Sequence, residues 1–121
     1  MKKILIIEDD KFLRELIARK LASEDFEPVE AKNGEDGFEK IKNENPDLVL
    51  LDLILPGIDG FEVLKQVREK QIAKETPIII LSNLGQKDDV DKGMSLGAVD
   101  FLIKAHFTPQ EIIEKIKSFL K

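Results

Sequence analysis

The sequence of 121 residues contains no cysteine, no tryptophan and no tyrosine, and its single histidine is His106. The absence of cysteine excludes disulfide bonds and thiolate metal sites. No apolar stretch is long enough to cross a bilayer, and there is no cleavable signal with a basic start and a small-residue exit. We therefore expect a cytoplasmic protein that does not engage a membrane. Since it has no cysteine or second histidine as a partner, His106 is expected in a surface or loop role rather than in catalysis or metal binding.

The chain also lacks basic runs and any interleaving of aromatic residues with arginine or lysine. Its 24 acidic residues outnumber the 19 basic ones, which gives a net charge of −5. An acidic domain of this kind is a poor candidate for direct binding of DNA or RNA. Hydrophobic residues make up 42% of the chain, and we expect a single domain over residues 1–121 with a core of its own.

Short apolar segments typical of strands alternate with segments of helical periodicity along the whole chain. The expected strands cover Lys3–Ile7, Glu27–Ala31, Leu48–Asp52, Ile78–Leu81 and Asp100–Ile103. The expected helices cover Lys11–Ser23, Glu35–Asn43, a segment that begins after Gly60, Lys87–Leu96 and a segment that begins at Pro109. This alternation predicts a doubly wound α/β domain with a flavodoxin-like (βα)5 arrangement, a five-stranded parallel sheet and strand order 2-1-3-4-5.

Local residues predict where several helices begin or end and which faces they bury. Asn33 is an expected N-cap, Gly97 suits the position after a helix end, and Thr108 with Glu111 forms a capping box. The expected buried faces consist of Phe12, Leu13, Leu16, Ile17 and Leu21 in the first helix and of Ile112, Ile113, Ile116, Phe119 and Leu120 in the last.

Two of the apolar strands end abruptly in acidic residues. Lys3–Ile7 is followed by Glu8, Asp9 and Asp10, and the strand that begins at Leu48 ends at Asp52. In an open parallel sheet, ligands bind outside the carboxyl ends of the strands. Carboxylates crowded at that edge repel one another and need a cation, and a hard cluster of oxygen ligands suits Mg²⁺. The sequence therefore predicts a Mg²⁺ site.

Four motifs occur in order at the ends of the first, third, fourth and fifth expected strands. They are Ile7–Asp10, Leu51–Gly60, Leu81–Asn83 and Gly97–Lys104. With them the chain resembles the receiver domain of bacterial two-component response regulators along essentially its whole length. Each motif is modest alone, but their joint order is specific.

The resemblance implies a set of metal ligands. Glu8 and Asp9 match the acidic pair of the family, with Asp9 as the direct Mg²⁺ ligand and Glu8 acting through water. Asp52 and the main-chain carbonyl of Ile54 complete the expected set. Asp10 lies one position beyond the pair, where capping of the next helix and a role at the metal are weighed equally.

The resemblance also implies the residues that handle phosphate. Asp52 matches the phosphoacceptor, Ser82 the conserved hydroxyl, Phe101 the aromatic switch and Lys104 the phosphate-binding amine. Without the resemblance, Ser82 is a loop hydroxyl and Phe101 is core. Lys104, an ammonium at the end of a buried strand, still needs an anionic partner.

The expected function is a phosphorylation-dependent signalling switch. A sensor histidine kinase or a phosphotransfer protein supplies the phosphoryl group to Asp52 in a Mg²⁺-dependent reaction. The protein thus catalyses its own phosphorylation and dephosphorylation without being a conventional enzyme. We expect a stand-alone receiver, monomeric or weakly dimeric, that contacts a downstream protein through Lys87–Leu96 and Asp100–Lys121.

Two positions depart from the family pattern. Ala105 follows Lys104 where the family usually has proline in a cis peptide, and a cis bond to a non-proline residue costs about 2.5–4 kcal/mol. Asn83 follows the hydroxyl where a small residue is usual, which narrows the expected entrance for phosphodonors.

Three alternatives remain. The first is an interaction module that keeps the receiver fold without phosphorylation; the complete acidic, hydroxyl and lysine positions argue against it, and the departures at Asn83 and Ala105 leave it open. A Mg²⁺ phosphatase of similar fold needs a second catalytic aspartate soon after the nucleophile, and residues 53–55 are Leu, Ile and Leu. A flavin-binding protein needs a phosphate-cradling loop after the first strand, which is absent here.

Overall fold

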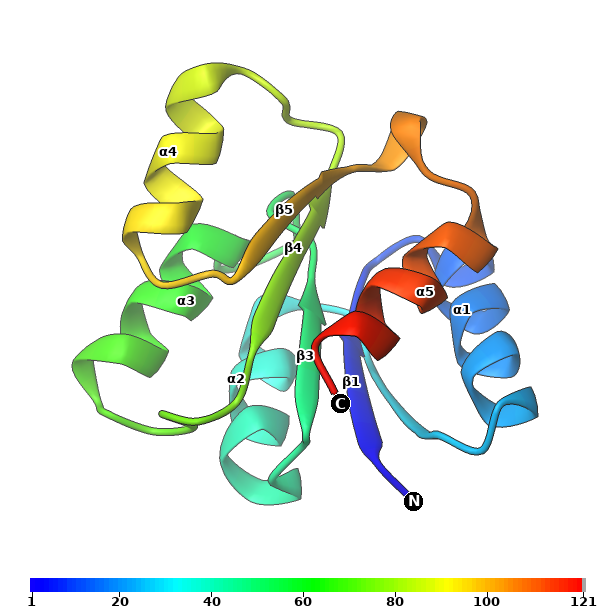
Figure 1. The fold of residues 1–121 in the computed structure, drawn as a ribbon. Coiled ribbons are helices and arrows are strands. Elements are labelled where there is room, and N and C mark those ends of the chain that lie inside the picture. Colours follow the sequence, from blue (N-terminus) through cyan, green and yellow to red (C-terminus); the bar gives the residue numbers. More distant parts are fainter. Residues whose placement is uncertain (121) are drawn as a thin grey trace.

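A computed structural model describes residues 1–120 and contains one five-stranded sheet with the strand order β2-β1-β3-β4-β5 (Figure 1). Every pair of neighbouring strands is parallel. The strands are β1 (Lys3–Ile7), β2 (Glu27–Ala31), β3 (Leu48–Leu51), β4 (Ile78–Ser82) and β5 (Asp100–Ile103). The predicted fold class and strand order are therefore confirmed.

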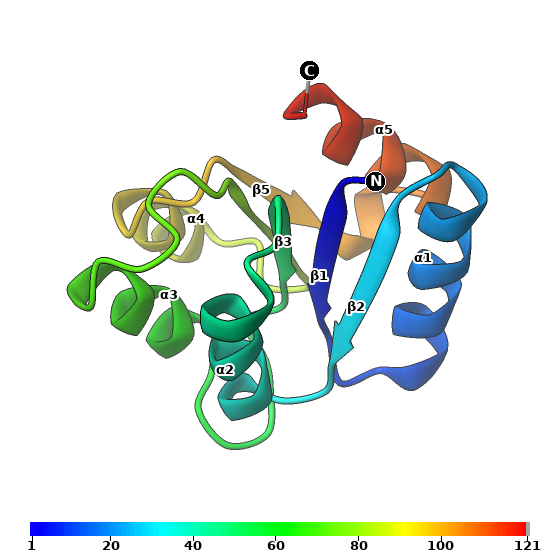
Figure 2. The same ribbon diagram turned by 90° about the horizontal axis from the view of Figure 1, so that it is seen from below.

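Five α-helices cover both faces of this sheet (Figure 2). One face carries α1 (Lys11–Ser23) and α5 (Pro109–Ser118), and the other carries α2 (Gly34–Glu44), α3 (Gly60–Glu69) and α4 (Lys87–Ser95). A 3₁₀ turn over Lys104–His106, which the sequence did not predict, follows β5, and His106 is exposed there. No helix among residues 1–120 is long and apolar enough to span a bilayer.

The central strands β1, β3 and β4 are buried on both faces because nearly all their residues are Ile, Leu or Val. Successive side chains point to opposite faces, so each strand contributes to two core layers. In β3, for example, Leu48 and Leu50 pack toward α1 and α5, whereas Val49 and Leu51 pack in the other layer. The edge strand β2 contains Pro28, which lacks a backbone donor and is tolerated where one side of a strand has no neighbour.

The predicted helix ends are largely confirmed. Asn33 Oδ1 accepts a hydrogen bond from Asp36 N at 2.7 Å, and Thr108 and Glu111 form the reciprocal capping box. Gly97 follows the end of α4 with φ of +99°, a left-handed value that favours glycine. Some boundaries differ by one residue, and β3 ends at Leu51, which leaves Asp52 just beyond the strand.

Two residues that the sequence predicted to be buried are exposed. Phe12 is 72% exposed, because it lies on the side of α1 away from its buried residues Ile17, Ala18 and Leu21. Phe119 is 37% exposed, because α5 ends at Ser118 and Phe119 is its C-cap. Helical periodicity predicts both residues on the buried face of their helices, but the buried face of each helix is narrower than the periodicity predicts.

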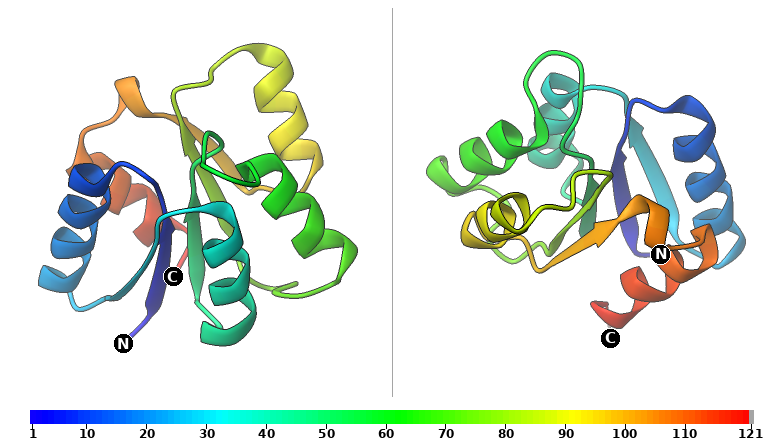
Figure 3. Two further views of the ribbon diagram at one scale, coloured as in Figure 1. Left: turned by 180° about the vertical axis from the view of Figure 1, so that it is seen from behind. Right: turned by 90° about the horizontal axis from the view of Figure 1, so that it is seen from above.

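The carboxyl ends of the strands meet at the upper edge of the sheet in Figure 1, seen from above in the right panel of Figure 3. The segments that leave β1, β3, β4 and β5 therefore lie near one another, although up to about a hundred residues of chain separate them. This edge is where the predicted site residues lie.

Candidate functional site

A cleft of about 180 Å³ lies at this edge, lined by Glu8, Asp9, Asp10, Asp52, Ile54, Asn83 and Lys104. Two larger hollows lie elsewhere, one between α3 and α4 and one beside α1 and β2. Size does not decide between them, since the small cleft alone holds a convergent group of three potential metal ligands among residues 1–120.

Those three residues are Glu8, Asp9 and Asp52, each of which offers a carboxylate oxygen within 4.8 Å of the others. Glu8 and Asp52 are buried and Asp9 is exposed. Backbone hydrogen bonds continue the sheet into the cleft, from Glu8 N to the Ala31 carbonyl and from Asp52 N to the Ile7 carbonyl, each at 3.0 Å. The ends of β1 and β3 thus fix the backbone of Glu8 and Asp52.

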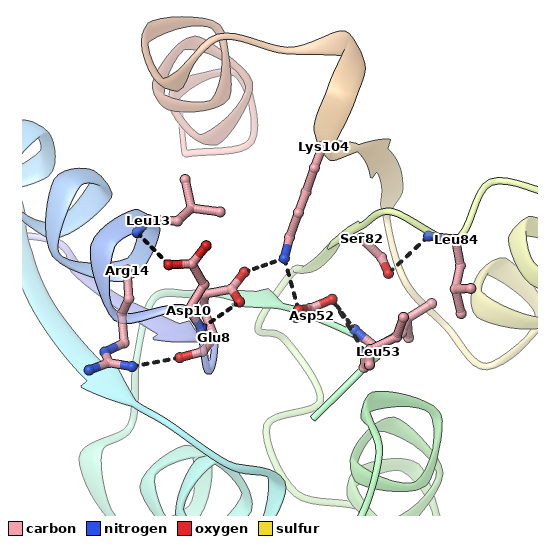
Figure 4. A network of polar contacts seen from close by, with 10 residues as sticks. Glu8, Asp10, Leu13, Arg14, Asp52, Leu53, Ser82, Leu84 and Lys104 are labelled. Atoms are coloured by element: carbon pink, nitrogen blue, oxygen red, sulfur yellow. Dashed lines mark hydrogen bonds and ion pairs between the residues drawn. The ribbon is translucent and has the colours of Figure 1, made fainter. Parts of the chain in front are cut away.

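Lys104 supplies the positive charge of the cleft (Figure 4). Its Nζ lies 2.7 Å from Glu8 Oε1 and 2.9 Å from Asp52 Oδ2. The prediction that an ammonium at the end of a buried strand has an anionic partner is confirmed. The single ammonium of Lys104 does not balance the carboxylates of Glu8, Asp52 and Asp9, which lies at the rim of the cleft. The cluster therefore stays negative.

The electrostatics of the cleft shift two ionisable groups. Burial raises the pKa of Glu8 to about 7, and the negative charge of Asp52 adds to this, whereas the Lys104 ammonium and the Asp10 backbone N–H oppose it. Burial acts to lower the pKa of Lys104, but its contacts with Glu8 and Asp52 outweigh burial and raise the pKa above its ordinary value. Lys104 is therefore protonated at neutral pH.

Both oxygens of the Asp52 carboxylate have partners. Oδ1 accepts hydrogen bonds from Leu53 N at 2.7 Å and from Ile54 N at 3.4 Å, and Oδ2 accepts one from Lys104 Nζ. This arrangement holds the Asp52 side chain in one orientation at the floor of an open cleft. A carboxylate held in this way can act as a nucleophile toward phosphorus.

The donor set fits a magnesium ion. Glu8 Oε1 is buried and accepts no hydrogen bond of good geometry from residues 1–120, although Lys104 Nζ lies close to it. Carboxylate oxygens are the hard ligands that Mg²⁺ prefers. Glu8, Asp9 and Asp52 could hold the ion, and Ile54, whose main-chain carbonyl is the fourth predicted ligand, also lines the cleft.

Ser82 and Phe101 lie beside the cleft rather than in its lining. Ser82 is fully buried at the end of β4, where its Oγ accepts a hydrogen bond from Leu84 N at 3.3 Å. Phe101 in β5 packs partly buried against the apolar layer under α4. A Cβ at Gly93 of α4 would lie 2.5 Å from Ile80 Cδ1 and 3.3 Å from the Phe101 ring, so the absence of a side chain there lets α4 rest on both residues.

Two further residues, Asp10 and Asn83, line the cleft. Asp10 caps α1, since its Oδ1 accepts a hydrogen bond from Leu13 N at 3.2 Å, and it also lines the cleft. Asn83 is exposed at the rim. The peptide between Lys104 and Ala105 is trans, because residues 1–120 contain no cis peptide bond.

One residue that touches the site, Arg14, was not predicted from the sequence. Its Nη1 donates a hydrogen bond to the main-chain carbonyl of Glu8 at 2.8 Å (Figure 4). An arginine near the start of a helix is ordinarily solvated, so only the packing of α1 against the end of β1 reveals this contact.

Comparison with known proteins agrees with this geometry. A family model of the response regulator receiver domain matches residues 4–117. The transcriptional regulatory protein ResD of Bacillus subtilis is 39% identical over 119 residues, which cover 98% of this chain and 48% of ResD. The chain thus spans about half the length of this and other curated relatives that it matches.

Solved structures give the same match. A receiver domain of a Francisella response regulator superimposes with a TM-score of 0.90 at 29% identity and covers 98% of this chain and 96% of that chain. The response regulator TrrA of Thermotoga maritima, solved in complex with Mg²⁺ and BeF, has a TM-score of 0.84 at 34% identity. The match covers 98% of this chain and 99% of the TrrA chain.

Proposed function

The chain belongs to the response regulator receiver domain family, and we propose that Asp52 is its phosphoacceptor and that the cleft around Asp52 is its phosphorylation site. Receiver domains of two-component systems take a phosphoryl group from histidine kinases and generally use Mg²⁺ at an acidic pocket. The single observation that carries the assignment to Asp52 is its position between the Lys104 ammonium and the Glu8–Asp9 pair.

The proposed reaction is transfer from a phosphohistidine donor. An Asp52 carboxylate oxygen attacks phosphorus, the bond from phosphorus to the histidine nitrogen breaks, and its electron pair stays with that nitrogen. The product is an acyl phosphate on Asp52. Lys104 Nζ, already 2.9 Å from Asp52 Oδ2, pairs with a phosphoryl oxygen. Glu8, Asp9 and Asp52 would hold a Mg²⁺ ion, which would neutralise further negative charge.

We propose that the signal leaves the site through Ser82 and Phe101. Ser82 lies at the end of β4, and movement of its hydroxyl toward a phosphoryl oxygen leaves room beside Phe101 on the adjacent strand. Because α4 rests on the Phe101 ring at Gly93, a change at Phe101 is passed to α4. The proposed output face consists of α4, β5 and α5, and Lys121, the last residue predicted for it, lies outside the described residues.

We further propose that residues 1–121 act as one receiver unit with two protein partners: a sensor histidine kinase or phosphotransfer protein as donor, and a downstream protein on the output face. The rival remains an interaction module that is never phosphorylated. The crowding of Glu8, Asp9 and Asp52 around one ammonium argues against it, since such a module gains nothing from carboxylates that repel one another.

Phosphorylation by acetyl phosphate in the presence of Mg²⁺ tests the proposal. Intact-mass measurement should show one added phosphoryl group on the wild type and none on Asp52→Asn. Asp25→Asn is a matched control, because Asp25 is exposed and its φ of +68° is one that asparagine also adopts. An unmodified wild type would favour the rival, whereas equal modification of Asp52→Asn would mean that another residue accepts the phosphoryl group.

A further inference from the structure

Arg14 makes two polar contacts from the first turn of α1. Its Nη1 donates to the Glu8 carbonyl oxygen at 2.8 Å, and its Nε pairs with Glu30 Oε1 at 3.0 Å. The side chain is only 12% exposed. A guanidinium presents several donors at fixed positions in a plane, so Nε and Nη1 of one arginine each meet a different acceptor.

The Glu8 carbonyl lies just beyond the last residue of β1, where the sheet no longer supplies all its donors. The Glu8 N–H donates a hydrogen bond to the Ala31 carbonyl, and the Arg14 guanidinium donates one to the Glu8 carbonyl. Both backbone groups of Glu8 are therefore held, one by β2 and one by α1.

This contact reaches Asp9 through the peptide bond. Because a peptide unit is planar, an anchored Glu8 carbonyl also sets the position of Asp9 N and Asp9 Cα. The Asp9 side chain is exposed, and no hydrogen bond or ion pair to another residue in 1–120 orients its carboxylate. Its direction into the cleft thus depends on its backbone.

Glu30 completes the arrangement from the edge strand β2. Its carboxylate pairs with Arg14 Nε and so restricts the guanidinium to the orientation that serves Glu8. The contacts form a chain from Glu30 in β2 through Arg14 in α1 to the Glu8–Asp9 peptide (Figure 4 shows Arg14 and Glu8).

We propose that Arg14 is a positioning residue for the metal site, which orients the Glu8–Asp9 peptide and thereby raises the affinity of the cleft for Mg²⁺. The inference rests on the proposed function, since it takes Glu8, Asp9 and Asp52 as the ligands. Groups that orient metal ligands typically change metal affinity roughly 10- to 100-fold when they are removed.

The sign of the effect separates positioning from simple electrostatics. Arg14 is a cation near an acidic cluster, so loss of its charge alone would strengthen Mg²⁺ binding. Loss of positioning would weaken it. Arg14→Met removes both charge and donors, and Arg14→Lys keeps the charge but cannot bridge the same two acceptors.

The experiment is a Mg²⁺ titration followed by the NMR amide shifts of residues 8, 9 and 52, because the chain has no tryptophan or tyrosine to report binding by fluorescence. We expect the Kd to rise roughly tenfold or more in Arg14→Met and Arg14→Lys. Arg19→Lys, on the exposed side of the same helix, is the matched control and should leave the Kd unchanged. In the metal-free spectra, shifts of the Arg14 variants should concentrate at Glu8 and Asp9 and spare β4.

A Kd within about twofold of the wild type in either Arg14 variant, or tighter binding by Arg14→Met, would overturn the proposal, since a tenfold change is expected. If the Arg14 variants do not fold, Glu30→Asp decides, because it keeps the negative charge but withdraws the carboxylate from Arg14 Nε; an unchanged Kd there also overturns the proposal. A wild type that binds no Mg²⁺ would instead refute the metal site itself.

Discussion

Glu8, Asp52 and Lys104 form a charged group in which each residue shapes the behaviour of the others. Two buried carboxylates share one ammonium, and burial raises the pKa of Glu8 to about 7. A buried carboxylate of this kind destabilises the fold when it is ionised and gains from a second cation. The same charges that suit the cleft to Mg²⁺ therefore reduce stability in its absence.

The first prediction concerns the pH dependence of stability in a chelating buffer. The pKa of Glu8 rises from 4.5 to about 7 on folding, so the folded chain holds the proton of Glu8 more tightly than the unfolded chain. The stability gained from this proton is fully present below about pH 4.5 and is lost as the pH rises through 7. Glu8→Gln removes this loss, which amounts to no more than about 3 kcal/mol. Urea unfolding at pH 5 and pH 7.5 should show that the free energy of unfolding falls more in the wild type than in Glu8→Gln as the pH rises. An equal change in both proteins would contradict the raised pKa of Glu8.

The second prediction concerns Lys104, which directly follows β5 and contacts Asp52. Lys104→Ala should still accept a phosphoryl group but should not pass the change to α4 and β5, because the contact between the phosphoryl group and the end of β5 is lost. Amide shifts with and without beryllofluoride measure this, and Lys74→Ala, an exposed lysine outside the cleft, is the control. If beryllofluoride shifts the amides of α4 and β5 in Lys104→Ala as it does in the wild type, Lys104 does not couple the site to these elements.

At the scale of elements, the loop between β3 and α3 is held by α2. The Glu35 carboxylate accepts a hydrogen bond from Ile58 N at 3.2 Å. Gly34 lies so close to the loop that an added Cβ would overlap the Ile58 carbonyl oxygen. The loop that carries Ile54 beside Asp52 is thus seated on the start of α2, which makes its position a property of two elements.

Gly34→Ala tests this seating. Alanine favours the helix by up to about 1 kcal/mol, but a forced separation of packed backbone costs about 1–3 kcal/mol, so we expect net destabilisation. Gly37→Ala in the same helix is the matched comparison, because its Cβ would meet the Ile7 side chain at 2.7 Å, and a side chain yields more readily than backbone. Thermal unfolding should rank Gly34→Ala as the less stable variant; the reverse order would argue against a tight seat.

The same loop governs the fourth prediction, on the lifetime of the phosphoryl group. Ile54 is 56% exposed and lines the cleft, where its apolar side chain offers no group to orient a hydrolytic water. Ile54→Asn should therefore shorten the lifetime of phosphorylated Asp52. Loss of radiolabel after removal of the donor measures it, with Phe12→Asn, an exposed position outside the cleft lining, as the control. Slower or unchanged decay would place control of the lifetime elsewhere.

At the scale of the whole molecule, the cleft is joined to both core layers. Asp52 follows β3, whose alternate residues pack against the helices on the two faces of the sheet, and Glu8 follows β1 in the same way. A ligand that binds the cleft of the folded chain therefore stabilises the entire domain by mass action.

The fifth prediction follows from this linkage. At a free Mg²⁺ concentration roughly ten times its Kd, the gain in stability is about 1.4 kcal/mol, which raises the melting temperature by several degrees. Differential scanning calorimetry with and without Mg²⁺, in a buffer free of Ca²⁺, measures the change in melting temperature. Asp9→Ala should abolish the gain, and an equal shift in both proteins would mean that Mg²⁺ acts at another site.

The sequence alone determined the architecture and the chemistry brought to one edge of the sheet. Apolar runs such as Ile4–Ile7 are too short for helices and too apolar for half-exposed strands, so they specify buried parallel strands. Once the strands are parallel, the acidic residues after β1 and β3 must meet. Residues whose effect is local, such as Asn33 and Gly97, were also predictable because a cap depends on only a few neighbouring positions.

Only the tertiary structure decided which side chains touch. The pairing of Lys104 with both Glu8 and Asp52, the hold of Arg14 on the Glu8 carbonyl and the exposure of Phe12 depend on how elements far apart in the chain pack together. Hydrophobic periodicity records which face of an element is buried, but not the depth of burial or the partner that it meets. Those depend on the distances between packed elements, which a one-dimensional pattern does not contain.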